Sequence, residues 1–153
     1  MADRTHRQIS LDRLDEGVYL ARNERGGQLR FGSRAGDAFT PVELLLAAIA
    51  GCSAVDIDIV TGRRATPSTF SALAEAESVR DDTGNLLDGI EVSFRVRFPP
   101  GADGDAARAV LPWAQRISRD RTCTVSRTVA AGVPVAFRIA GEEVAGEDAR
   151  ADG

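Results

Sequence analysis

The chain contains few of the residues that enzymes most often use for covalent chemistry. Its only histidine is His6, beside the N-terminus. That position argues against a Ser-His or Cys-His nucleophile pair. The only thiols are those of Cys52 and Cys123. If the protein catalyses a reaction, thiol chemistry is therefore the most economical hypothesis.

Lysine is also absent, and all 19 cationic residues are arginine, a bias typical of GC-rich coding sequence that carries no functional information. The net charge of −4 argues against nucleic acid and anionic membranes as partners. The N-terminus lacks the apolar core of a secretory signal, and the strongest apolar run, residues 44–55, is too short to cross a bilayer. We therefore expect a cytoplasmic protein whose cysteines are free thiols, and two ligands without a flanking histidine do not make a zinc site.

Hydrophobic periodicity and turn signals predict both strands and helices in one domain over residues 1–140, followed by an acidic disordered tail over 141–153. The expected strands cover residues 8–11, 18–22, 28–31, 70–79, 90–98 and 133–139. The expected helices cover residues 41–62, 103–120 and 123–131.

The helix that begins after residue 40 has the clearest start signal in the chain. Thr40 suits the N-cap, Pro41 the first helical position, and Glu43 completes a Thr-x-x-Glu capping box. Between residues 44 and 55 this helix is apolar on nearly every side. Such a helix must be covered all round, so we expect a second subunit to contribute to its burial.

Cys52 lies on this helix, and its position allows two interpretations. It shares a stripe with Leu45, Ala48, Val55 and Ile59, as expected for a small buried core residue. Alternatively, it is a reactive thiol. The helix N-terminus is three turns away and Asp56 would raise its pKa, so a reactive Cys52 needs an arginine from elsewhere in the fold.

Cys123 is better placed to ionise, because it lies at the start of a predicted helix, where unpaired N–H groups stabilise a thiolate. Arg127, one turn later, can add to this effect. The alternative is that Cys123 only caps the helix and Arg127 only faces solvent. Asp58 is expected to need a partner, and Arg63 or Arg64 can pair with it or cap the helix C-terminus.

Two segments of the chain resemble the OsmC/Ohr family of osmotically inducible and organic hydroperoxide resistance proteins. Residues 40–56 (TPVELLLAAIAGCSAVD) are similar to the central helix of that family, and residues 123–129 (CTVSRTV) to its second-cysteine motif. The order of predicted elements agrees from about residue 8 to 139. The resemblance implies an α+β fold in which strongly bent antiparallel sheets wrap around long central helices in an intertwined homodimer.

The resemblance also implies a thiol peroxidase that reduces organic hydroperoxides and forms its active sites at the dimer interface. Cys52 matches the attacking cysteine and Cys123 the resolving one, and an external dithiol would restore the pair without metal or cofactor.

The match to the peroxidase branches of the family is incomplete. Those branches carry a glutamate where this chain has Val42, and Glu43 follows one residue later. They also carry an activating arginine in an early strand or turn, for which Arg13 and Arg22 are the candidates. These departures keep a second hypothesis open, in which the chain is a non-catalytic module that binds a lipid-like or sulfur-containing ligand in the groove between subunits.

Overall fold

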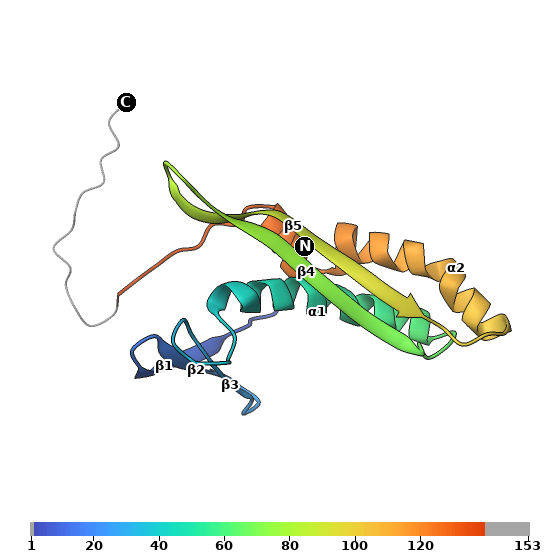
Figure 1. Ribbon diagram of the computed structural model, residues 1–153, viewed down its shortest axis with the longest axis horizontal. Helices are drawn as coiled ribbons and strands as arrows, with labels where there is room; N and C mark the ends of the chain where they lie inside the picture. The colour runs from blue at the N-terminus through green and yellow to red at the C-terminus, as the bar shows by residue number, and fades with distance from the viewer. Residues whose placement is uncertain (1, 140–153) are drawn as a thin grey trace.

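A computed structural model describes residues 2–139 of the chain. It combines two antiparallel sheets with three α-helices and one short π-helical segment, as shown in Figure 1. In chain order the elements are β1 (Ile9–Asp15), β2 (Val18–Asn23), β3 (Gln28–Phe31), α1 (Pro41–Gly62), β4 (Thr69–Asp81), β5 (Gly84–Arg97), α2 (Ala102–Ile117), η1 (Ser118–Thr122) and α3 (Thr124–Ala130). The α+β class predicted from the sequence is confirmed.

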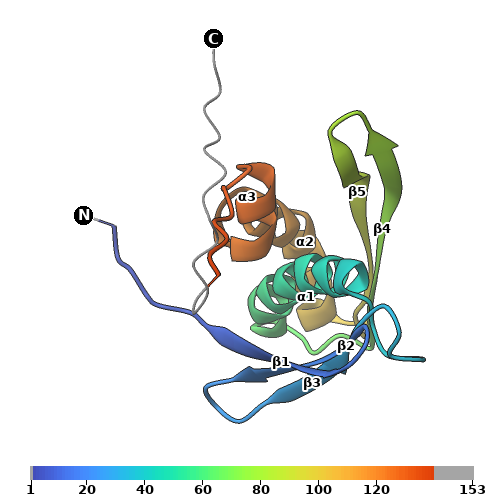
Figure 2. The ribbon, with the colours of Figure 1, turned by 90° about the vertical axis from the view of Figure 1, so that its left-hand side faces the viewer.

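The N-terminal sheet has the strand order β1-β2-β3, and both pairs are antiparallel. Figure 2 shows this sheet crossing one side of α1. The loop after β3 requires glycine at residue 32. A Cβ there would lie 2.0 Å from the carbonyl oxygen of Gly17, so no larger residue fits without moving the backbone.

The second sheet is a long hairpin of β4 and β5. Strand β4 extends past both ends of the strand predicted over residues 70–79, whereas β5 begins at Gly84 instead of residue 90 and ends at Arg97. Asp81 closes its turn by accepting hydrogen bonds from the backbone N–H groups of Thr83 and Gly84. Phe70 and Phe94 pack edge to face, with ring centroids 6.3 Å apart. The hairpin lies along α1, on the side away from α3 (Figure 2).

Helix α1 begins as its sequence predicts. The Thr40 side chain accepts a hydrogen bond from the N–H of Glu43, and the Glu43 carboxylate accepts one from the N–H of Thr40 at 2.7 Å. The helix packs against α2, β4, η1 and α3. The side chains it buries are Ile49, Ile57 and Thr61. These positions are four or eight residues apart and form one stripe, which places the core on that face.

The opposite face of α1 is not covered by its own chain. Val55 and Ile59 are 59% and 54% exposed. The complete helix has 22 residues and a mean hydropathy of 1.9 in its most apolar window, so by length and composition alone it could cross a membrane. The conclusion that residues 44–55 are too short to cross a bilayer therefore does not apply to the complete helix. Such a helix is weak evidence for a membrane span, because the central helix of a soluble protein passes the same test.

The expected second helix divides into two elements. Helix α2 contains Pro112 and ends at Ile117, and η1 adds one wider turn over Ser118–Thr122. Such π-helical turns are rare and occur frequently at functional sites. The turn leads directly to Cys123, whose backbone is extended and which forms the N-cap of α3.

The prediction of a strand over residues 133–139 is wrong for the single chain, where these residues form no regular element. The alternating apolar side chains are exposed, Val135 at 73% and Phe137 at 90%. A strand needs a neighbouring strand for its hydrogen bonds, and within residues 2–139 none pairs with this segment. The tail predicted over residues 141–153 lies outside the described residues.

Replacement of Thr40 by alanine should lower the free energy of unfolding by about 1 kcal/mol, because it removes the N-cap hydrogen bond of α1. Urea denaturation at fixed protein concentration would measure this change. Thr40→Ser keeps the hydroxyl and should retain most of the wild-type stability. Equal loss in both variants would contradict the capping role.

Candidate active site

The fold brings Cys52 of α1 and Cys123 at the start of α3 into contact. Both thiols are free. The two thiols are near enough for each to shift the pKa of the other: Cys123 raises that of Cys52, and Cys52 lowers that of Cys123. Cys52 is half-buried, whereas Cys123 has no exposed surface. Two thiols far apart in the sequence therefore form one coupled pair, of which only Cys52 is open to solvent.

Cys123 lies among groups that favour its ionised form. Its sulfur accepts a hydrogen bond from the N–H of Ser126 at 3.4 Å, and the Ser126 hydroxyl lies 3.1 Å away. Burial acts to raise the pKa of Cys123, but hydrogen bonds from the hydroxyls of Ser126 and Ser53 and from the Ser126 N–H outweigh it. The pKa therefore lies below the ordinary value of 9.0. The sequence prediction that Cys123 lies at a helix start is confirmed.

Cys52 is affected in the opposite direction. Burial is the largest of the causes that raise its pKa above 9.0, followed by the hydrogen bond with Cys123 and the negative charges of Cys123 and Asp56. The backbone N–H of Val125 lowers the pKa, but by less. The directions of the two shifts make Cys123 the more acidic thiol of the pair.

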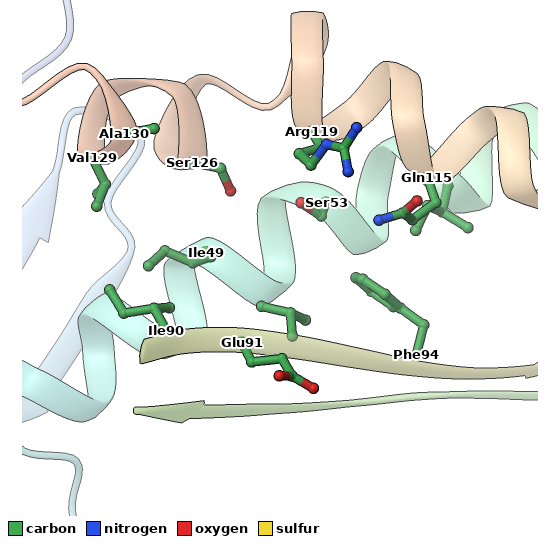
Figure 3. Close-up of a pocket in the computed structure, with 12 residues that line it drawn as sticks. Ile49, Ser53, Ile90, Glu91, Phe94, Gln115, Arg119, Ser126, Val129 and Ala130 are labelled. Atoms are coloured by element: carbon green, nitrogen blue, oxygen red, sulfur yellow. The ribbon is translucent and has the colours of Figure 1, made fainter. Parts of the chain in front are cut away.

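A cavity of about 370 Å³ is lined in part by Ser53 and Ser126, the two serines that lower the pKa of Cys123 (Figure 3). Its walls are mainly apolar side chains of α1, β5 and α3. Its polar groups are Ser53, Glu91, Gln115, Arg119 and Ser126. Because the Ser53 and Ser126 hydroxyls also bond to Cys123, the cavity and the thiol pair share part of one wall.

Of the other candidate residues, Arg127 lies nearest to the thiols along the chain. It belongs to α3, but its guanidinium donates to the carbonyl of Arg121 at 3.5 Å. Glu43 is held in the capping box at the start of α1, where hydrogen bonds from the backbone and side chain of Thr40 lower its pKa. Neither residue is among the main causes of the pKa shifts of the two thiols.

The early-strand arginines lie on the N-terminal sheet. Arg22, on β2, forms an ion pair with Asp12 of β1, and Arg13 lies on β1 opposite Tyr19. No guanidinium is among the main causes of the thiol pKa shifts. Within residues 2–139, then, the structure brings the two cysteines together but does not add Arg22 or Glu43 to them.

Sequence reasoning missed the polar residues that surround the pair. Ser126 could have been found, because the third residue after an N-cap is the usual donor to the cap side chain. Ser53 gave no signal beyond its place next to Cys52. The partners of Asp56 were not predicted either, and they are the hydroxyls of Ser118 and Thr122.

The C-terminal end of α1 agrees with one of the two interpretations made from sequence. Arg64 donates to the carbonyl of Val60 at 3.3 Å and so caps the helix.

Within residues 2–139, no group of three or more His, Cys, Asp or Glu side chains is arranged to hold a metal ion.

Comparison with known proteins identifies the fold. The family model for OsmC-like proteins matches residues 34–138, which include both cysteines, α1, the hairpin and the two later helices. The chain belongs to the OsmC-like protein family. OsmC-like proteins are soluble, which agrees with treating α1 as a core helix.

Several proteins described as uncharacterised, hypothetical or OsmC-like are similar to this OsmC-like chain. Uncharacterised proteins of Mycobacterium tuberculosis and Mycobacterium bovis are 26% identical over 133 residues, which cover 86% of this chain and 95% of theirs. A hypothetical protein from Aquifex aeolicus has a TM-score of 0.67 at 20% identity, covering 84% of this chain and 89% of its own. An OsmC-like protein from Mycoplasma pneumoniae has a TM-score of 0.64 at 14% identity, covering 82% and 88%. These likenesses confirm the fold.

The coupled thiols predict a specific response to alkylation. Cys52 should react with iodoacetamide slowly at pH 7 and about tenfold faster for each pH unit up to 9, because only the thiolate reacts and its pKa is raised. Cys123→Ala removes the thiol that raises this pKa, so the rate profile should shift to lower pH. Mass spectrometry after timed labelling measures both profiles.

Cys52→Ala provides the matched measurement on the second thiol. Cys123 should react more slowly than its lowered pKa would allow, since it is fully buried, until denaturant is added. An unchanged Cys52 profile in Cys123→Ala would show that the thiols do not influence each other.

Proposed function

We propose that this OsmC-like protein is a thiol-dependent hydroperoxide reductase, in which Cys52 attacks the peroxide and Cys123 resolves the product. The observation that carries the proposal is the contact between two free thiols of opposite accessibility and opposite pKa shift. Cys52 is the thiol that a substrate can reach. Cys123 is enclosed and has the lowered pKa, as suits a group that attacks a neighbouring sulfur.

The reaction consumes one peroxide and two thiols. The Cys52 thiolate attacks the distal peroxide oxygen, the O–O bond breaks, and the alkoxide leaves as alcohol after taking a proton. The Cys123 thiolate then attacks the sulfenic sulfur of Cys52, and hydroxide leaves as water after taking a proton. An external dithiol restores both thiols by exchange and becomes oxidised itself.

The pKa shifts indicate how Cys52 can be activated without an arginine from the same chain. The Cys52 thiol must lose its proton before attack, and the more acidic Cys123, once ionised, is a neighbouring group that can take it. Transfer to Cys123 exposes the Cys52 thiolate and leaves a proton beside the departing alkoxide. The mainly apolar cavity next to the pair suits the organic part of a hydroperoxide.

Exposure of the reduced protein to one equivalent of cumene hydroperoxide should produce an intramolecular disulfide, with loss of two hydrogens from the intact mass. Cys52→Ser should abolish the oxidation, whereas Cys123→Ser should stop at a sulfenic acid that a dimedone probe traps.

The alternative hypothesis, a non-catalytic module that binds a lipid-like ligand, is also supported by the apolar cavity. It predicts a different result. Under that hypothesis, folded protein does not oxidise, and a fatty acid raises the melting temperature equally in the wild type and in Cys52→Ala. That pair of results would contradict the peroxidase proposal.

We further propose that the active protein is a homodimer that works in the cytoplasm. The support is the apolar surface that one chain leaves open. It includes Val55 and Ile59 on α1 and the alternating residues Val135 and Phe137, each more than half exposed. A second copy can cover the α1 face and supply a strand edge for residues 133–139.

Sedimentation equilibrium should therefore give twice the chain mass of 16.2 kDa. Ile59→Glu places a charge on the open face of α1 and should shift the equilibrium toward monomer, because burying an unpaired charge is costly. Asp58→Asn, next to it and also exposed, is the matched control and should remain dimeric. A wild-type monomer at micromolar concentration would contradict the proposal.

A further inference from the structure

The Asp56 carboxylate joins the helix that carries Cys52 to the segment that carries Cys123. Its Oδ2 atom accepts a hydrogen bond from the Ser118 hydroxyl at 2.9 Å and another from the Thr122 hydroxyl at 2.7 Å. Asp56 lies one helical turn beyond Cys52, and Thr122 directly precedes Cys123. One carboxylate oxygen thus links the chain segments that bear both thiols.

Ser118 extends this link to the backbone of Cys123. The Ser118 side chain is 1% exposed, and its carbonyl oxygen accepts the N–H of Cys123 at 2.9 Å. This bond closes the wide turn of η1, which connects α2 to α3. Two connections therefore fix the position of Cys123 relative to α1. Both end at Asp56, one through Ser118 and one through Thr122.

The charge of Asp56 does not help Cys52 to react. It raises the pKa of Cys52 and so opposes formation of the attacking thiolate. Asp56 therefore does not activate Cys52 electrostatically, and its remaining contribution is to the geometry of the thiol pair. Geometry matters for this pair, because a disulfide requires Cα atoms about 4.4–6.8 Å apart and correctly directed Cβ atoms. Helix α3 is short and cannot hold Cys123 in place by its own length.

We propose that Asp56 is a positioning residue. By accepting the Ser118 and Thr122 hydroxyls, it holds the Cys123 segment at the separation from α1 at which Cys52 and Cys123 can form a disulfide. This inference rests on the proposed function, since a protein that never joins its thiols has no use for the arrangement. It goes beyond the proposed function, because it predicts which residues other than Cys52 and Cys123 set the equilibrium between the thiols and the disulfide.

The test measures disulfide formation without peroxide. The protein is equilibrated in mixtures of oxidised and reduced dithiothreitol, quenched in acid, and its intramolecular disulfide is quantified by mass spectrometry. Each oxidised dithiothreitol takes two electrons and two protons from Cys52 and Cys123 and is itself reduced. The ratio of oxidised to reduced reagent at half-conversion reports how well the two sulfurs are held together.

Thr122→Val removes one hydroxyl with little change in shape, and Thr122→Ser keeps the hydroxyl. Thr122→Val should need about a tenfold higher ratio of oxidised to reduced reagent, the factor expected for a lost hydrogen bond to a charged group. Thr122→Ser should match the wild type, and so should Asp58→Asn, which changes an exposed carboxylate two residues from Asp56. Asp56→Ala, which loses both bonds, should need a higher ratio than Thr122→Val.

The outcomes separate this inference from the proposed function. If Thr122→Val lowers the melting temperature but leaves the redox midpoint unchanged, Asp56 is merely structural and the inference is overturned, while the peroxidase proposal stands. If the wild type forms the disulfide with dithiothreitol but not with cumene hydroperoxide, and the variants shift as expected, the positioning role stands and the peroxidase proposal fails. If the wild type forms no disulfide at any ratio, both are overturned.

Discussion

The packing of η1 and α3 against α1 is the constraint on which the candidate site depends. It places a fully buried thiol at the N-cap of one helix next to a half-buried thiol in the middle of another. Helix α3 by itself favours ionisation of Cys123, because the hydroxyl and N–H of Ser126 belong to it. The approach of the two helices adds a mutual effect, in which Cys123 raises the pKa of Cys52 and Cys52 lowers that of Cys123.

One cysteine of the pair has the lower pKa, and the other is the one exposed to solvent. Interactions with Ser126 and Ser53 outweigh the desolvation of Cys123, so the thiol with no exposed surface has the lowered pKa. Cys52 is exposed enough to meet a substrate but has the raised pKa. In the proposed reaction the two thiols are therefore interdependent, because the accessible sulfur must give up its proton and the enclosed, more acidic sulfur can take it.

The fold of one chain leaves a large part of its apolar surface open. The stripe of α1 that contains Val55 and Ile59 faces away from the core, and the apolar residues of 133–139 have no strand beside them. Cys52 lies near this open stripe rather than on the buried one formed by Ile49 and Ile57. Its interpretation as a packed core residue therefore does not hold within the chain.

Much of the architecture follows from local signals. The capping box of Thr40 and Glu43 predicted the start of α1 to the residue, and the alternation at residues 90–98 predicted β5, although its strand is longer. The strand expected at 133–139 was wrong for one chain, because alternation predicts which residues can pair but not whether an edge is available. The proposed redox pair was expected through resemblance to a family, and its surroundings could not be predicted from spacing.

By itself, the amino-acid sequence determined most of the helices and strands and the capping geometry, since these depend on interactions within a few residues, and it limited the candidate reactive groups to two thiols. Only the tertiary structure decided that Asp56 binds the hydroxyls of Ser118 and Thr122, that Ser53 and Ser126 lie beside Cys123, and which thiol is more acidic. These features arise where distant segments meet. The energy of a buried polar group depends on its neighbours there, not on its position along the chain.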